Sequence, residues 1–404
     1  MWFRVPLRNL SRNFRRTALS LAIIGLGTAL TFIVLGFVYS SIDIIQNSLL
    51  RRYGNLQIAR TEVWDDTTDE LISPMEGDLV SSVEVYLDEN PEVEEHSSQL
   101  SFTALLIADR SSNPVKVIGI EPEKGVISYG DSIVQGENLK KGISDSALIG
   151  QALAERMGVK PGDRIRLIVE TEEGKRNSGT VEITGIYKAQ SKEVEGRQIY
   201  LPISYGQELA GKAGIDRIAV KLRNRGASER IARQLEDQFE SASLPLETRT
   251  WKELSSFYEM LRSFFGLIFG FLVVVVSVLV FFIVLQVLTM SFLERSREVG
   301  TVRALGTLRG EVFRMFVVES IALGTAGAGL GLALGLVVAV AFNAVGINWT
   351  PPGSVDPVVL TIKMGWSNIW PAALISLAAT VISSFYPAFR MSREDIVDSL
   401  RVEE

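Results

Sequence analysis

Long apolar stretches alternate with polar ones along this chain, and four of them are long enough to cross a membrane. Residues 18–41, 264–292 and 364–389 carry no charged side chain, and residues 315–345 carry only Glu319. A helix rises about 1.5 Å per residue, so about 20 apolar residues cover a hydrocarbon core roughly 30 Å thick. The pattern therefore predicts four transmembrane helices over these ranges, of which the second is long enough to tilt or to project beyond the bilayer.

The polar segments differ in charge, and the difference predicts which side of the membrane each one occupies. Arginines are concentrated in residues 1–17, 293–314 and 390–404. Because basic residues are retained on the cytoplasmic side, these three segments, and with them both termini, are predicted to be cytoplasmic. Residues 42–263 and the short loop at 346–363 are then extracytoplasmic.

Residues 42–263 are patterned as a mixed α and β domain. Apolar and polar residues alternate at 165–169 and again, after a Gly-containing turn, at 181–183, which is typical of a β-hairpin. Apolar residues four apart predict helices over 78–89 and 228–239. The expected fold class is a membrane α-helical protein with an α+β extracytoplasmic domain inserted between the first and second transmembrane helices. Further strands are predicted at 55–59, 101–108, 115–120 and 218–222, with a turn at Asp109–Pro114.

Both ends of this inserted domain are expected to be helical. The apolar stripe of the first span continues through Ile45 and Leu49, and residues 251–261 carry a second stripe before the second span. The pattern predicts two stalk helices that connect the extracytoplasmic domain to the membrane. The alternative is that Trp251 and Tyr258 are ordinary anchors at the membrane interface.

Composition narrows the function classes. The formal charge is −6 and cysteine is absent, so the chain lacks the basic surface of a nucleic-acid-binding protein and has no disulfide or thiolate metal site. The single histidine, His96, is interpreted as a solvated side chain, because a zinc site needs several converging ligands. Residues 61–100 contain many acids and no Lys or Arg, which indicates a solvated face, since no spacing there is that of a calcium loop.

Catalytic motifs are missing from the sequence. It has no G-x-x-x-x-G-K-[ST] phosphate loop, no G-x-S-x-G elbow and no H-E-x-x-H. The chain is therefore predicted not to be an enzyme. Glu319 lies about one turn inside the third span, and no other span carries a charge, so it is interpreted as a structural residue near the membrane edge rather than a proton relay.

The third span carries a ladder of glycines at Gly324, Gly327, Gly331 and Gly335, most of them four residues apart. Small residues at this spacing let helix backbones approach closely inside lipid, where apolar collapse does not drive helix association. The ladder therefore predicts tight helix packing, either within this chain or between two chains.

Between the second and third spans lies the charged segment Glu294–Gly306, with the sequence ERSREVGTVRALG. This segment, its continuation into Phe316–Ser320 and the glycine ladder are similar to the FtsX-like, or MacB-type (type VII), permeases of ABC transporters. The start, Leu7–Thr17, and the end, Tyr386–Arg401, resemble the amphipathic N-terminal helix and C-terminal tail of that family. Residues 147–186 resemble its periplasmic core domain.

The resemblance implies partners and a docking site. A separate ABC ATPase dimer, which would hold ATP and magnesium, would dock on the charged segment, so that this chain needs no cofactor of its own. A second permease chain, the same or different, would complete the membrane part, in contact with membrane lipids. Gly300 and Gly306 would bound the short coupling helix. The alternative is a solvated cytoplasmic loop. The coupling residues implied are Glu294, Arg295, Arg297, Glu298, Gly300, Arg303, Ala304, Leu305 and Gly306.

The function implied is that of a permease subunit in a bacterial inner membrane. It would transmit ATP-driven motion of the ATPase to the extracytoplasmic domain, a mechanism called mechanotransmission. Gly54–Arg60, followed by Trp64, looks more like lipoprotein-releasing permeases than like drug exporters, so lipoprotein or other amphipathic cargo is favoured, with a periplasmic adaptor as a further possible partner. The alternatives are a non-transporting FtsX-like regulator of an extracytoplasmic enzyme, a MacB-like peptide or drug efflux permease, and a membrane-anchored binding module without an ATPase.

Overall fold

In the computed structural model the chain folds into two compact units. Unit 1 comprises Met1–Ile44, Met260–Asn348 and Val359–Glu404, and unit 2 comprises Ile45–Glu259 and Trp349–Val358. The predicted cytoplasmic helix at 1–17, the tail at 390–404 and the loop at 346–363 lie wholly or partly outside the described residues. The residues described are 14–64, 74–108, 111–126, 133–171, 174–189, 195–349 and 358–393.

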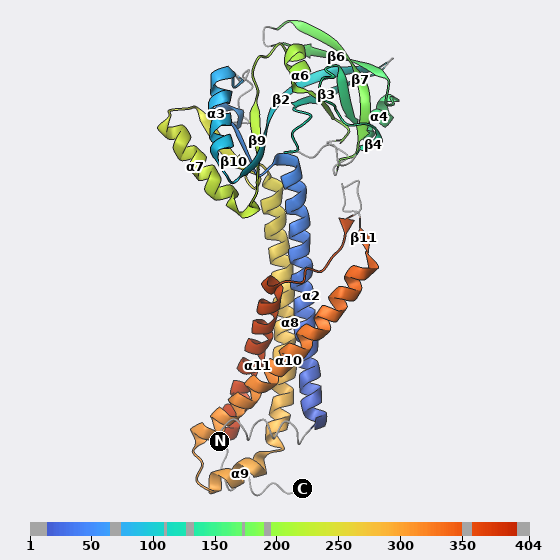
Figure 1. The fold of residues 1–404 in the computed structure, drawn as a ribbon. Helices are drawn as coiled ribbons and strands as arrows, with labels where there is room; N and C mark the ends of the chain where they lie inside the picture. Colours follow the sequence, from blue (N-terminus) through green and yellow to red (C-terminus); the bar gives the residue numbers. More distant parts are fainter. Residues whose placement is uncertain are drawn as a thin grey trace. The chain divides into compact units, whose positions relative to one another are not determined.

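Four long helices supply the apolar part of the molecule (Figure 1). Each is long and apolar enough to cross a membrane. The prediction of four transmembrane helices, with an α+β domain between the first and the second, is confirmed. Each helix is longer than the apolar run that predicted it, because backbone hydrogen bonding continues into the flanking polar residues. The helices are α2 (Phe14–Tyr53), α8 (Ser256–Leu293), α10 (Arg309–Val345) and α11 (Trp366–Arg393).

The two predicted stalk segments differ in structure. The first is helical, since α2 continues without a break along the predicted stripe. In the second, residues 251–254 form a turn, closed by a hydrogen bond from the Leu254 N–H to the Thr250 carbonyl (3.0 Å). The prediction of helix from residue 251 is therefore wrong in its first turn. Trp251 and Tyr258 stack edge to face across this turn, with ring centroids 4.8 Å apart.

Close helix packing in unit 1 depends on glycine. The Gly327 carbonyl oxygen and the Gly331 nitrogen lie 3.5 and 3.6 Å from the position that a Cβ would occupy on Gly25 of α2. Helices α2 and α10 therefore cross backbone against backbone. Gly335 also faces α2, and Gly324 faces α11. The glycine ladder thus packs within the chain, which is the first of the two alternatives that the sequence left open.

The segment that precedes α11 is fastened to α2 and α10 by polar contacts. The Asn343 side chain donates to the Ile362 carbonyl (3.0 Å) and accepts from the Ile362 N–H (2.8 Å). Lys363 forms an ion pair with Asp43, and its N–H donates to the Gly36 carbonyl (3.1 Å). A Cβ on Gly36 would lie 2.8 Å from the Lys363 carbonyl oxygen, so glycine is what lets this segment lie against α2.

Unit 2 is organised around one sheet of ten strands, with the order β10-β1-β9-β2-β3-β8-β5-β7-β4 and with β6 paired to β2 and β7. Strand β1 lies between β9 and β10 and is antiparallel to both. The β3–β8 and β5–β7 pairs are parallel. The strands are β1 (Leu56–Arg60), β2 (Val93–Ala108), β3 (Ser111–Ile120), β4 (Ile133–Gly136), β5 (Ser146–Gly150), β6 (Arg164–Glu170), β7 (Arg176–Tyr187), β8 (Gln198–Pro202), β9 (Arg217–Leu222) and β10 (Leu246–Thr250).

Most of the elements predicted for this domain are present. The hairpin at 165–183 is confirmed as β6 and β7, and the two helices are confirmed as α3 (Gly77–Glu89) and α7 (Ser228–Ser241). The predicted turn at Asp109–Pro114 is too long, because β3 begins at Ser111 and Pro114 pairs opposite Leu105 within the ladder. Strand β5 was not predicted, since all five of its residues are buried and show no alternation.

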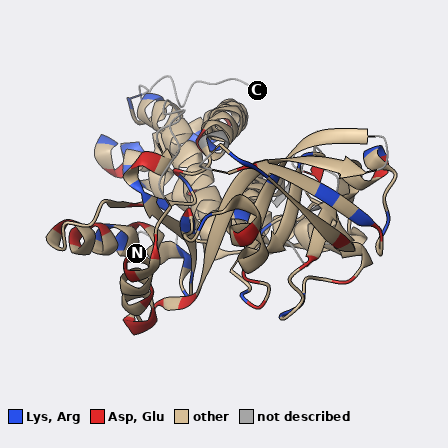
Figure 2. Ribbon diagram, turned by 90° about the horizontal axis from the view of Figure 1, so that it is seen from above, with Lys and Arg blue, Asp and Glu red and all other residues tan. Residues whose placement is uncertain are grey.

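Two large apolar cores lie on different parts of this sheet, and a smaller cluster surrounds Leu148 and Tyr187. One lies beneath β6 and β7 and includes α4 (Gln151–Met157) and α6 (Ile203–Ala210), with Leu153 and Leu209 buried. The other packs α3 and α7 on β1 and β9, with Leu87 and Phe239 buried. Short 3₁₀ turns follow β1 and precede α7, at Thr61–Trp64 and Arg225–Ala227. Acidic and basic residues both occur along much of the ribbon (Figure 2), whereas α3 carries acids and no Lys or Arg.

Candidate functional site

The charged segment between α8 and α10 folds as a short helix, α9 (Ser296–Ala304) (Figure 1). A turn at Glu294–Arg295 separates it from α8. Gly306 follows it with a φ of +99°, a conformation that glycine adopts without strain, and the Gly306 N–H donates to the Arg303 carbonyl (3.0 Å). Gly306 therefore bounds the helix, as the resemblance implies.

Gly300 does not bound the helix, and this expectation was wrong. It lies in the middle of α9 and is buried. The helix begins four residues earlier, directly after the turn that ends α8. The Val299 N–H already donates to the Arg295 carbonyl (3.0 Å), so backbone hydrogen bonding passes through this position without a break. Gly300 belongs instead to the buried face of α9.

One face of α9 is buried in unit 1. Its buried residues are Ser296, Val299 and Gly300. Val299 joins a cluster that includes Phe292 at the end of α8 and Phe316 of α10. The two phenylalanine rings lie 4.0 Å apart between centroids, at an interplanar angle of 34°. The helix is therefore held against the ends of α8 and α10 by apolar contacts.

A buried ion pair lies beside this cluster. Arg295 Nη1 donates to both carboxylate oxygens of Glu319, each at 3.0 Å, and Arg295 Nε donates to Glu298 at 3.3 Å. The side chains of Arg295 and Glu319 are 10% and 8% exposed, whereas Glu298 is half exposed. The Arg295 guanidinium also lies over the Phe316 ring, 5.9 Å from its centroid.

The ion pair changes the roles of two residues considered from the sequence. Arg295 was implied as a contact for the ATPase, but its guanidinium is buried within unit 1 and engaged by Glu319. Glu319 is structural, as interpreted, but it has a charged partner, which the sequence did not reveal. Because the pair joins the turn after α8 to α10, its immediate effect is on the position of α9.

The remaining surface of α9 and the turn that follows it are exposed and together define the outer face of the site. Val302, Leu305 and the following Leu308 are 41%, 83% and 69% exposed, an unusual density of bare apolar side chains on a polar segment. Charged and small residues surround them, and Arg303 is half-buried. The exposed neighbours from the predicted set are Glu294, Arg297, Glu298, Ala304 and Gly306.

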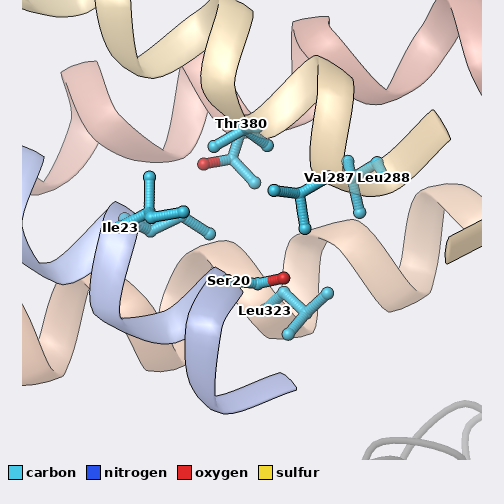
Figure 3. Close-up of a pocket in the computed structure, with 8 residues that line it drawn as sticks. Ser20, Ile23, Val287, Leu288, Leu323 and Thr380 are labelled. Atoms are coloured by element: carbon cyan, nitrogen blue, oxygen red, sulfur yellow. The ribbon is translucent and has the colours of Figure 1, made fainter. Parts of the chain in front are cut away.

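A cavity among α2, α8, α10 and α11 has room for about one water molecule. Ser20, Val287, Leu323 and Thr380 point into it from the four helices (Figure 3). This cavity is too small for a solute. Within the described residues, no group of three or more His, Cys, Asp or Glu side chains could hold a metal ion. The expectation that His96 is solvated was wrong, because its side chain is buried and its Nε2 lies 3.0 Å from Asp88 Oδ1.

Two described families match the sequence. The MacB-like periplasmic core domain matches residues 17–238, and the FtsX-like permease C-terminal region matches residues 268–396. The first match covers more than half of the chain and ends within unit 2, and the second begins in α8 and includes all of α9 and α10. The sequence similarity therefore extends over the extracytoplasmic domain and over the candidate site.

Named relatives agree with these matches. The lipoprotein-releasing system transmembrane protein LolE of Haemophilus influenzae is 24% identical over 339 residues, which cover 77% of this chain and 78% of LolE. LolC of Neisseria meningitidis is 26% identical over 328 residues, covering 75% of this chain and 77% of LolC. The macrolide export ATP-binding/permease protein MacB of Shewanella sp. (strain ANA-3) is 30% identical over 120 residues, covering 30% of this chain and 17% of MacB.

One solved structure is similar to about half of the chain. The periplasmic region of MacB from Actinobacillus actinomycetemcomitans is 13% identical, and the match covers 52% of this chain and 95% of that one, with a TM-score of 0.37.

Proposed function

The chain belongs to the FtsX-like permeases with a MacB-like periplasmic core domain, which are membrane subunits of ABC transporters, and from this premise we propose how it works. A separate ATPase dimer docks on the outer face of α9. ATP-driven motion of that dimer passes through α8 and α10 to the extracytoplasmic domain. The chain hydrolyses no ATP itself and acts with a second permease chain, and its termini are cytoplasmic.

The observation that carries this proposal is the two-sided construction of α9. Its inner face is fixed to α8 and α10 through Val299 and Arg295, and its outer face presents Val302 and Leu305 to solvent. Exposed apolar side chains with charged neighbours are typical of a protein interface, where buried anchors supply affinity and the charged rim supplies specificity. A solvated loop, the alternative from the sequence, needs neither the buried face nor the exposed leucine.

Transport through a channel within this single chain is a poorer account of the described residues. The cavity lined by residues of α2, α8, α10 and α11 has room for about one water molecule. Movement of the extracytoplasmic domain needs no such channel, which favours mechanotransmission.

The docking step is tested by placing a charge on the outer face. Val302→Asp and Leu305→Asp are each expected to weaken binding of the co-purifying ATPase at least tenfold, since burying an unpaired carboxylate removes an apolar anchor and adds a desolvation cost. Val85→Asp is the matched control, because Val85 is 56% exposed on α3 of unit 2. Binding of the ATPase would be measured in detergent, with the permease immobilised on a sensor surface. Unchanged affinity in both α9 variants would refute docking on this face.

The coupling step is tested separately. Arg297→Ala combined with Glu298→Ala is expected to leave cargo release well below that of the parent at equal ATP turnover, in vesicles reconstituted with the ATPase. Arg176→Ala, an exposed arginine on β7, serves as the control. Equal release per ATP in the double variant and the parent would contradict the coupling role.

We propose lipoprotein, or another amphipathic molecule with a lipid anchor, as the cargo. LolE and LolC, whose names describe lipoprotein release, match over three quarters of this chain, whereas MacB of Shewanella matches over less than a third. A fluorescent triacylated lipoprotein in the reconstituted vesicles should leave the membrane in an ATP-dependent way. Release of a macrolide but not of the lipoprotein would favour the efflux alternative, and release of neither would favour the regulator.

A further inference from the structure

The geometry around Arg295 points to a function that rests on the proposed one and deepens it. We propose that Arg295 and Glu319 are positioning residues: their buried ion pair fixes the α9 docking helix to both α8 and α10, so that displacement of α9 moves the two helices together. Neither residue contacts the ATPase in this proposal.

The position of Arg295 in the chain is the first argument. It lies in the turn between α8 and α9, two residues after α8 ends, whereas Glu319 lies within α10. Their contact therefore joins the end of α8 to a helix that is separated from it in sequence by all of α9. Without it, the described hydrogen bonds of the Arg295 side chain would include only the one to Glu298, which belongs to α9 itself.

The surroundings of the pair are the second argument. Both side chains are at least nine-tenths buried, and Phe316, which is fully buried, lies beneath the guanidinium. A charged group in such a place is strongly disfavoured when its partner is removed, while a surface pair contributes little. One guanidinium nitrogen, Arg295 Nη1, lies 3.0 Å from both carboxylate oxygens of Glu319, and such charge-assisted hydrogen bonds fix the two side chains relative to each other. The contact is therefore stiff as well as strong.

The aromatic contact next to the pair is the third argument. Phe292, in the last turn of α8, stacks against Phe316 of α10. This contact holds the two helices close but leaves sliding possible, since apolar contacts have little directional preference. The ion pair adds the direction that the aromatic contact lacks. Together, the ion pair and the aromatic contact make the end of α8, the whole of α9 and the start of α10 one rigid body.

The test separates docking from transmission. Glu319→Gln and Arg295→Lys are compared with the parent in vesicles containing the ATPase, and three quantities are measured: ATPase affinity, ATP turnover and cargo released per ATP. We expect affinity within about twofold of the parent and release per ATP reduced about fivefold or more. Asp43→Asn is the matched control, because it removes the acid of an exposed ion pair in the same unit. It should leave release per ATP unchanged.

A chemical replacement of the ion pair keeps the proposal testable if either variant folds poorly. The chain has no cysteine, so Arg295→Cys combined with Glu319→Cys introduces its only two thiols. Bridging them with a reducible bifunctional reagent before the ATPase is added should restore release per ATP, and reduction should abolish it again. A one-ended thiol reagent of similar length should restore nothing.

The outcomes distinguish this inference from the proposed function. Release per ATP in Glu319→Gln equal to that of the parent, or a bridge that restores nothing in a folded protein, would overturn the positioning role alone. Failure of the parent chain to bind any ATPase would instead overturn the proposed function. A loss of affinity as large as the loss of release would assign the pair to docking rather than to transmission.

Discussion

Substitution of Gly331 by alanine tests the backbone contact between α2 and α10 most directly. A Cβ at this position would lie 2.3 Å from the Gly25 carbonyl oxygen, whereas ordinary contact begins at 3.4 Å. The two helices must therefore separate locally by about 1.1 Å, a gap that forfeits roughly a quarter to a half of each dispersion contact along the crossing. Overpacking of this kind costs about 1–3 kcal/mol. We expect the upper part of that range, because backbone atoms cannot rotate away as a side chain can.

Neighbouring glycines provide a graded series on the same helix. At Gly327 a Cβ would meet the Ile24 side chain at 2.6 Å, and at Gly335 it would meet the Phe32 ring at 2.8 Å. Side chains can adjust, so the expected losses decrease in the order Gly331, Gly327, Gly335.

The matched control for this series is Gly329→Ala, where nothing lies within 4 Å of the added Cβ. Alanine favours a helix over glycine by up to about 1 kcal/mol, so this variant should be as stable as the parent or more so. The assay is SDS titration in mixed micelles, followed by circular dichroism. Equal unfolding midpoints for the Gly331 and Gly329 variants would refute the reasoning.

Three further predictions concern unit 2. Phe239→Ala should destabilise the domain by about 3–5 kcal/mol in a urea titration, since this side chain on the buried face of α7 is 1% exposed. A loss below about 1 kcal/mol would contradict the packing described. Gly150→Ala should also destabilise the domain in this titration, because the added Cβ would lie 2.0 Å from the Glu195 carbonyl oxygen. Gly158→Ser serves for comparison: nothing lies within 4 Å of its added Cβ, so its only strain is that of the positive φ. Burial, and to a smaller extent the neighbouring carboxylates, raises the pKa of Glu236 above 4.5. The folded state therefore binds the proton more readily than the unfolded state, and the stability of the domain falls as the pH rises through that raised pKa. Glu236→Gln should therefore stabilise the domain at pH 7, with an advantage that disappears in melting curves recorded below pH 4.5.

The membrane helices were predictable because one physical requirement dominates them. Backbone groups in lipid must bond to each other, so an uncharged run of sufficient length has to be a helix. The same reasoning located the polar segment between α8 and α10. It could not place the first turn before α8 correctly, because the apolar stripe at Leu254 and Tyr258 continues through a turn that the Trp251 stack stabilises.

The ion pair at the candidate site could not be predicted, and its geometry shows why. Arg295 and Arg297 are two positions apart in a run of similar residues, so the sequence gives them similar roles. On a helix two positions differ by about 200° in direction, and only the way in which α9 packs decides which arginine is buried. A partial signal existed: a lone carboxylate near the end of an apolar span needs a charged partner nearby, and the arginines of the preceding segment were the available candidates.

The strands of unit 2 were predictable only where one face is exposed. Strands β6 and β7 alternate because one side of their hairpin is solvated, and their pattern is visible in the sequence. Strands such as β5 are buried on both faces and carry no period. The order of strands is a property of long-range pairing, which no local pattern encodes.

That order has a consequence for how the protein is made. Strand β1 leaves the ribosome soon after α2, yet both of its neighbours in the sheet, β9 and β10, follow only after residue 216. The extracytoplasmic domain therefore cannot close its sheet until nearly all of it has been synthesised and moved across the membrane. Until then both edges of β1 lack a neighbouring strand, and the four residues that are buried in the folded domain have nothing to pack against. Such exposed strands are a typical starting point for misassembly. We expect this interval to be when the chain depends most on chaperones outside the cytoplasm, and truncations that end before β9 to be degraded rather than folded.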